Sequence, residues 1–190
     1  MNRSQHSYLV AALVVLVVGV SARASMQTPE KYTATAAVKA ASGAAATAPV
    51  TIEVSRKMSQ QEADALTAAF KTGGAAALRK ALEGSKPTGT ITIGSGTPVP
   101  TRLTVERPTD NGRMLTIVSD RPLALLGAGL PDAKPSAGFD FGIVDIVIDA
   151  AGNGTGTMSP AAKVTVKNGA FVVDEYSGEL IRLTGVKLVK

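Results

Sequence analysis

Apolar and polar residues alternate along most of this chain, which predicts a protein built mainly from β-strands. The pattern is clearest at Val50, Ile52 and Val54, which share one face while the residues between them are polar. A period of two is typical of a strand in an antiparallel sheet that buries one face. The same alternation predicts strands over residues 31–38, 90–93, 102–107, 113–119, 139–149, 163–167, 170–176 and 181–189.

The period changes from two to that of a helix in one stretch, residues 59–83. Ser59 and Glu62 have the Ser-x-x-Glu spacing of a capping box, which marks the start of a helix. Gly73 and Gly74 are expected to end that helix, because glycine readily takes the left-handed conformation found just past helix ends. A second helix is expected after them. We therefore predict a helical hairpin with one apolar face, inserted after the second strand.

Short turns connect nearly all the predicted strands, so neighbouring strands are expected to be antiparallel. Asn-Gly pairs at 111–112 and 168–169 are strong hairpin signals, and Gly185 is expected to mark a β-bulge because the apolar phase shifts there. The chain lacks the regular strand–helix–strand alternation of a parallel sheet. The predicted fold is mainly β (α+β by content): an antiparallel β-sandwich or barrel of eight or nine strands. The sequence leaves both arrangements open.

The N-terminus has the three parts of a cleavable signal peptide. A short basic segment is followed by an unbroken apolar run at 9–20, and then by small residues that end in Ala24. The run is shorter than the roughly 20 residues that a membrane-spanning helix needs. We expect cleavage after Ala24, and a protein that is periplasmic or secreted with no integral membrane span after cleavage.

This prediction divides the chain into three parts: a signal peptide at 1–24, a first strand with an Ala/Thr/Ser-rich connection at 25–49, and a single β-rich domain at 50–190. The connection itself is expected over 40–49. After cleavage the chain would contain 18 basic and 15 acidic side chains. They are scattered and aromatic residues are scarce, whereas nucleic-acid binding favours a dense basic stripe with stacking rings. A nucleic-acid partner is therefore not expected.

The chain has no cysteine, and its only histidine, His6, lies within the predicted signal peptide. Residues 25–190 therefore lack the side chains that several classes of catalytic site require. Ser-His-Asp and Cys-His nucleophile systems and the usual zinc sites need those side chains. We predict no catalytic residue, no metal site and no cofactor. The segment 149–156 is glycine-rich, but it lacks the closing acid of a calcium loop and is interpreted as a turn.

The segment after the strand at 113–119 holds the candidate ligand-binding residues. They are two charged residues and four leucines of the long loop at 122–138: Arg121, Asp140, Leu123, Leu125, Leu126 and Leu130. In one interpretation the loop and Arg121 frame a binding surface. In the other, which we favour, the leucines pack over the end of the core and Asp120 with Arg121 forms a structural pair.

Several short motifs give the chain a family resemblance that covers most of residues 25–190. The more specific are Asp120-Arg121-Pro122 and the closing Ile181-Arg182-Leu183-Thr184-Gly185-Val186; the others are 50–53, the Ser-x-x-Glu helix start, 73–74, 141–144, 152–158 and 160–164. Together they resemble a family of exported bacterial proteins of unknown function. The resemblance implies export and a single β-rich domain, and it implies no activity, ligand or catalytic residue.

The leading expectation is a non-enzymatic exported protein that binds a partner or forms part of the envelope. Its partner would be an unknown protein or a small apolar ligand. One alternative is a β-barrel carrier of a small apolar ligand, with the loop at 122–138 as its lid. Another is a carboxylate-dependent hydrolase of envelope polysaccharide, in which Asp140 would act with Asp174 or Glu175. A third is a module that inhibits proteases through an exposed loop.

Overall fold

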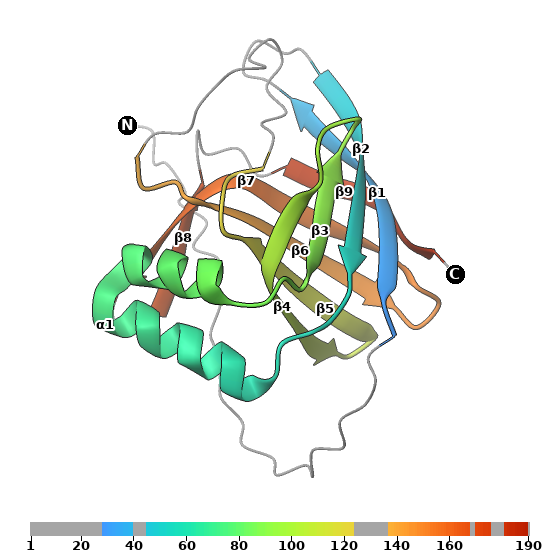
Figure 1. The fold of residues 1–190 in the computed structure, drawn as a ribbon. Coiled ribbons are helices and arrows are strands. Elements are labelled where there is room, and N and C mark those ends of the chain that lie inside the picture. Colours follow the sequence, from blue (N-terminus) through green and yellow to red (C-terminus); the bar gives the residue numbers. More distant parts are fainter. Residues whose placement is uncertain (1–27, 40–44, 124–136, 168–169, 176–180, 190) are drawn as a thin grey trace, which may run out of the picture.

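Eight antiparallel strands close into a barrel in the computed structural model, and a ninth strand and one helix lie outside it (Figure 1). The structure describes residues 28–39, 45–123, 137–167, 170–175 and 181–189. Within them the elements are β1 (Glu30–Lys39), β2 (Ala45–Val54), α1 (Gln60–Gly84), β3 (Gly89–Ile93), β4 (Val99–Thr109), β5 (Gly112–Ser119), β6 (Phe141–Asp149), β7 (Asn153–Lys167), β8 (Ala170–Glu175) and β9 (Ile181–Val189).

The barrel closes because β7 pairs on both of its edges. The strand order is β6-β5-β4-β3-β2-β1-β9-β7, and β6 also pairs with β7 to complete the ring. β7 is 15 residues long. Its first half pairs with β6 and β9, and its second half extends beyond β9 to pair with β8. Closure pairs the backbone groups that an open sheet would leave exposed at its edges, so of the two predicted arrangements the barrel is the one present.

Apolar side chains fill the interior of the barrel, as expected for a ring of eight strands. The alternation seen in the sequence places one face of each strand inside. The largest side chains that are less than 2 % exposed on these inner faces are Tyr32, Ile52, Ile91, Leu115, Ile117, Ile146, Ile148, Met158 and Leu183. This filled interior is the main core.

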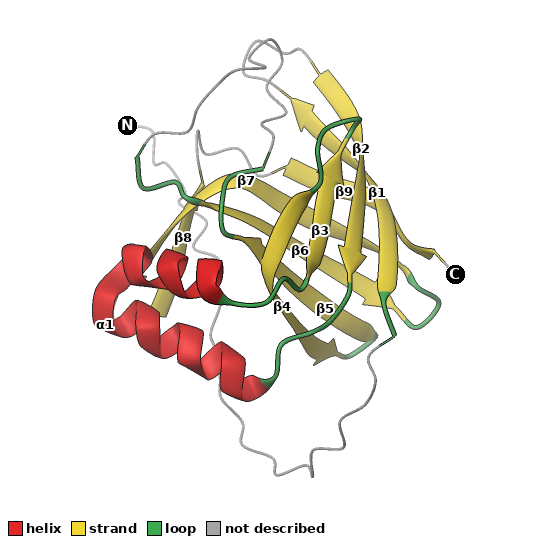
Figure 2. Cartoon of the chain, in the orientation of Figure 1, coloured by secondary structure: helices red, strands yellow, loops and turns green. Residues whose placement is uncertain are grey.

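A second, smaller core lies between the helix and the outer surface of the barrel. Leu66 and Leu82 of α1 cluster with Phe141, and Leu103 and Val164 pack against them from β4 and β7. Figure 2 shows α1 lying on one side of the barrel. The strands β4 to β7 are therefore covered on both faces along this wall. None of the helical structure in the described part of the chain combines the length and apolar character that crossing a bilayer requires.

The predicted helical hairpin is wrong in that 59–83 holds one helix, α1, instead of two. Ser59 caps its N-terminus and forms the predicted capping box with Glu62. Gly74 interrupts the helix with φ 65° and ψ −156°, a conformation that glycine adopts readily. Because this is the only residue in α1 with non-helical angles, the predicted break is a kink, with no loop separating two helices.

The strand boundaries differ from the predicted ones most at β7 and near the N-terminus. β7 begins at Asn153, ten residues before the predicted strand at 163–167, and it includes residues 153–156 of the predicted turn. β2 begins at Ala45, so it includes residues 45–49 of the predicted connection. Pairing with β1 explains the extension, because Ala36 lies opposite Ala48 in a continuous ladder. The predicted bulge is confirmed: Gly185 has φ 59°, and the register of β9 shifts there against both neighbours. The predicted hairpin turn at 110–112 joins β4 to β5.

Candidate functional site

One end of the barrel, which we call the mouth, carries charged side chains on interior-facing positions. Glu30 precedes Tyr32 by two positions on β1, and Arg113 precedes Leu115 by two on β5. Tyr32 and Leu115 are both fully buried in the barrel core. Residues two apart in a strand share a face, so Glu30 and Arg113 lie on the inner face where the strands reach the mouth.

Two further charged residues complete a ring of alternating charge, which we call the mouth network: Glu30, Lys57, Glu106 and Arg113. Arg113 Nη1 lies 2.9 Å from Glu30 Oε1 and 2.8 Å from Glu106 Oε2. Lys57 Nζ contacts the same two oxygens, at 3.3 and 2.5 Å. The hydroxyl of Tyr32 donates to Glu30 Oε2 at 2.7 Å and accepts from Arg113 Nη2 at 2.9 Å. Each charge therefore has two partners of opposite sign.

The mouth network keeps Glu30 ionised and Tyr32 neutral. Burial by itself would raise the pKa of Glu30, but hydrogen bonds from Tyr32 and Arg113 and the charge of Lys57 outweigh it and lower that pKa below 4.5. Burial, followed by the hydrogen bond to Glu30, raises the pKa of the Tyr32 phenol well above 10.0. A general acid needs a pKa near the working pH, and the environment of Glu30 shifts its pKa the other way.

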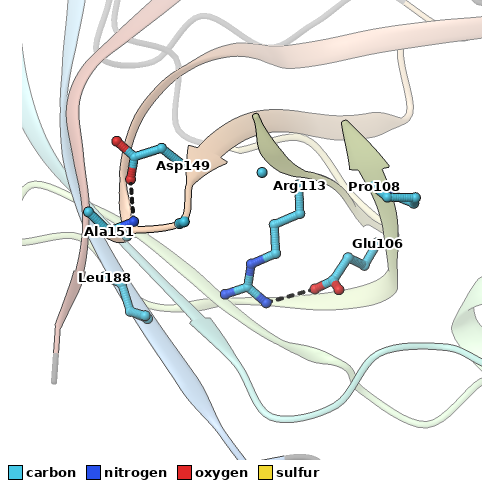
Figure 3. A pocket seen from close by; sticks show the side chains of 9 residues that line it. Glu106, Pro108, Arg113, Asp149, Ala151 and Leu188 are labelled. Atoms are coloured by element: carbon cyan, nitrogen blue, oxygen red, sulfur yellow. Dashed lines mark hydrogen bonds and ion pairs between the residues drawn. The ribbon is translucent and has the colours of Figure 1, made fainter. Parts of the chain in front are cut away.

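An open hollow of about 540 Å³, the mouth hollow, lies beside this network. It is lined by Glu106, Pro108, Gly112, Arg113, Asp149, Ala150, Ala151, Gly152 and Leu188. Figure 3 shows Arg113 extending from β5 into this space between Glu106 and Leu188. The mouth hollow thus combines a guanidinium, a carboxylate and an apolar wall, and the mouths of β-barrels are a usual place for ligand sites.

Asp149, on the rim of the mouth hollow, holds the turn between β6 and β7. Its Oδ1 accepts hydrogen bonds from the backbone N–H groups of Ala151 and Asn153, both at 2.9 Å. This bonding holds a turn at 150–152, which is shorter than the predicted glycine-rich turn at 149–156 because β7 already begins at Asn153. Within the described residues no group of three or more His, Cys, Asp or Glu side chains could hold a metal ion.

A second hollow, of about 230 Å³, brings together two residues proposed from the sequence, Arg121 and Asp140. It lies between α1 and the segments that follow β5 and precede β6, and it is lined by Arg79, Glu83, Asp120, Arg121, Pro122 and Asp140. Arg79 Nη1 is 3.5 Å from Asp140 Oδ1. The Arg121 side chain is 58 % exposed, so it borders this hollow mainly from the solvent side.

Asp120 is the buried member of that cluster and acts as an anchor. Its side chain is 2 % exposed, and its two oxygens accept from Arg102 Nε at 2.8 Å and Arg121 Nε at 2.9 Å. Burial by itself would raise the pKa of Asp120, but hydrogen bonds from Arg121 and Arg102 outweigh it and lower that pKa below 3.8. The pair that we favoured as a structural feature is present, with Arg102 as a second partner.

The predicted leucines can be followed only in part. Leu123 is 3 % exposed and belongs to the barrel core. Its backbone N–H donates to Pro160 O at 2.8 Å, and its side chain lies against Gly142. Leu123 therefore packs over the end of the core. The other three leucines, Leu125, Leu126 and Leu130, lie outside the described residues.

The carboxylates considered for a hydrolase can be followed only in part. Asp174 lies opposite Lys163 in the β7–β8 ladder, and the hollow that Asp140 lines does not include Asp174. The side chain of Glu175 lies outside the described residues. The carboxylates that do share partners are those of Glu30 and Glu106, which both contact Arg113 and Lys57.

Sequence reasoning missed the mouth network, although part of its signal is visible in the chain. Arg113 stands in phase with Leu115 and Ile117, and Glu30 in phase with Tyr32. A charged residue on the apolar phase of a strand, at the strand's end, indicates an interior-facing charge near an opening. Which of these charges meet depends on barrel closure, which the alternation does not specify.

Comparisons of this chain with protein-family models, curated proteins and solved structures gave no match.

Proposed function

We propose that the chain is an exported, non-enzymatic binding protein whose ligand sits in the mouth hollow. The observation that carries the proposal is the mouth network beside an open hollow with an apolar wall. Removing charges from water is unfavourable unless they are paired, and here four of them occupy the mouth of a barrel whose core is mainly apolar. Strongly interacting charges in a hollow mark a candidate binding site.

Binding fits the chemistry of the mouth better than catalysis does. Residues 25–190 contain no histidine or cysteine, the usual acid–base and nucleophilic side chains at neutral pH. Glu30 is held ionised by its partners. Because the barrel interior is filled by buried side chains, we place the ligand at the mouth. A carrier of a small apolar ligand would instead hold its ligand inside the barrel.

Export is tested by expressing the full chain in a bacterium and measuring the mass and N-terminal sequence of the protein outside the cytoplasm. We expect a polypeptide that begins at Ser25, since the predicted cleavage site follows Ala24. A chain that remains in the cytoplasm with residues 1–24 intact would overturn this part of the proposal.

Binding is tested by nuclear magnetic resonance on the exported protein, with three chemically different probes: L-alanyl-L-alanine, N-acetylglucosamine and octanoate. We expect at least one probe to give saturable shifts of the Gly112 and Gly152 amides, which line the mouth hollow. The Gly142 amide, near Leu123 at the other end of the core, should not move. The substitution Arg113→Gln should weaken binding at least about tenfold, so that these shifts saturate only at a higher probe concentration. The proposal fails if no probe moves the mouth amides, or if Arg113→Gln leaves their shifts unchanged.

A further inference from the structure

We infer that the mouth hollow selects a zwitterion, a small molecule with a free carboxylate and a free ammonium group, such as an amino acid or a short peptide. This inference rests on the proposed function and specifies the ligand class for the same site. It follows from hydrogen-bonding groups of the mouth network that still have capacity for a ligand.

The cationic half of the site is Arg113. A guanidinium carries five N–H donors, and in Arg113 three of them are used: two on Nη1 for Glu30 and Glu106, and one on Nη2 for the Tyr32 hydroxyl. Within the described residues, the Nε–H and the second Nη2–H have no hydrogen-bond partner. Two N–H groups on one planar cation suit a carboxylate, which has two acceptor oxygens.

The anionic half is Glu106. Its Oε2 contacts both Lys57 and Arg113, while its Oε1 has no hydrogen-bond partner among the residues that the structure describes. The side chain is 34 % exposed and lines the same hollow as Arg113. A ligand ammonium group would give Oε1 the partner that it lacks.

The closeness of these two groups explains why a ligand of one sign alone fits poorly. Glu106 Oε2 lies 2.8 Å from Arg113 Nη1, so an anion that approaches the guanidinium also approaches a carboxylate, and a cation at Glu106 approaches the guanidinium. A ligand with both charges meets an opposite charge at each end and avoids this repulsion. The wall formed by Pro108, Ala151 and Leu188 accommodates a small apolar side chain between the ends.

The test compares the affinity of the exported protein for L-alanyl-L-alanine with two blocked forms, N-acetyl-L-alanyl-L-alanine and L-alanyl-L-alanine amide. Each blocked form loses one charge; the amide keeps the size of the probe, and the acetylated form is larger by one acetyl group. Hydrogen bonds to charged groups are strong enough that we expect each blocked form to bind at least about tenfold more weakly. Affinities are obtained from the shifts of the Gly112 and Gly152 amides.

Two variants assign the charges to their partners. Arg113→Gln should make the peptide and its amide bind equally, because the carboxylate has lost its partner. Glu106→Gln should make the peptide and its acetylated form bind equally. Lys31→Gln is the control: Lys31 follows Glu30 on β1, but its side chain is 50 % exposed and pairs with Glu53 outside the mouth network. This control should leave all three affinities unchanged, and thermal melting checks that each variant is folded.

The blocked peptides keep the inference testable without any variant. If the peptide and both blocked forms bind at the mouth with equal affinity, or if only octanoate or N-acetylglucosamine moves the mouth amides, the zwitterion inference is overturned and the binding proposal stands. If no probe moves those amides, both fail. A tenfold preference for the unblocked peptide that Arg113→Gln or Glu106→Gln leaves intact would also overturn the inference.

Discussion

The substitution Tyr32→Phe removes one oxygen atom from the centre of the mouth network and tests whether the network is formed as described. The Tyr32 ring is fully buried in the barrel core, and phenylalanine preserves that packing. The lost hydroxyl donates to Glu30 at 2.7 Å and accepts from Arg113 at 2.9 Å. The perturbation is therefore confined to two hydrogen bonds with charged groups.

The size of the effect follows from those two contacts. A hydrogen bond to a charged group contributes about 1.5–3 kcal/mol to stability. Glu30 and Arg113 remain in contact with each other, at 2.9 Å, so neither charge is left without a partner. We expect the free energy of unfolding to fall by about 2 kcal/mol in total, measured by urea denaturation at pH 7 with an unchanged slope. Removing the exposed hydroxyl of Thr184 on β9 by Thr184→Val is the control, with an expected change of about 0.5 kcal/mol or less.

Alkaline titration gives an independent check with a definite sign. The pKa of Tyr32 in the folded protein is raised above its ordinary value of 10.0. The stabilisation linked to this shift is fully present below pH 10.0, and it is lost as the pH rises toward the folded pKa, by about 1.4 kcal/mol per pH unit. The Phe variant lacks this loss, so its stability should approach that of the wild-type protein as the pH rises above 10.0.

Either of two results would refute the reasoning about Tyr32. One is a Phe variant whose free energy of unfolding at pH 7 lies within about 0.5 kcal/mol of the wild type. The other is a stability difference that stays constant as the pH rises above 10.0.

Three further substitutions test other parts of the fold. Asp120→Asn leaves Arg102 without its buried anionic partner and should lower the free energy of unfolding by about 3 kcal/mol in urea; a change below about 0.5 kcal/mol would contradict the anchor role. Gly142→Ala would place Cβ 2.5 Å from Leu123 Cγ and should destabilise the protein by about 1–3 kcal/mol, seen as a lower melting temperature; an unchanged melting temperature would show that Leu123 packs elsewhere. Ser59→Ala removes the N-cap of α1 and should lower stability by about 1 kcal/mol, measured by urea denaturation followed by circular dichroism; an equally stable variant would exclude the capping box.

Most of the strands could be predicted because they follow a local pattern, whereas residues 153–162 of β7 were not predicted as strand. Val50, Ile52 and Val54 alternate with polar residues, and all three are buried in the barrel. Asn111 and Gly112 give the turn between β4 and β5. A period of two needs only a neighbouring apolar layer to bury one face, whatever the arrangement of the sheet. For the same reason it could not distinguish a sandwich from a barrel.

The helix shows the limit of a local signal. The capping box at Ser59 fixed where α1 begins, because its hydrogen bonds join residues three apart. The pair Gly73-Gly74 was predicted to end the helix, but α1 continues past it with a kink at Gly74. Whether that interruption is a loop or a kink depends on packing: Leu66 and Leu82, on either side of Gly74, belong to one cluster against the barrel wall. That contact joins residues distant in the chain, and no local pattern encodes it.

The sequence by itself determined most of the strand pattern, the start of the helix, and the lack of histidine and cysteine after residue 24, and it predicts a signal peptide at residues 1–24. Tertiary structure alone decided that β6 pairs with β7, which closes the barrel, and that Glu30, Lys57, Glu106 and Arg113 meet at its mouth. The physical reason is how far apart along the chain the interacting residues are. Periodicity and capping involve neighbours a few positions apart, whereas Glu30 and Arg113 are 83 positions apart and come together only when the strands between them are placed in register.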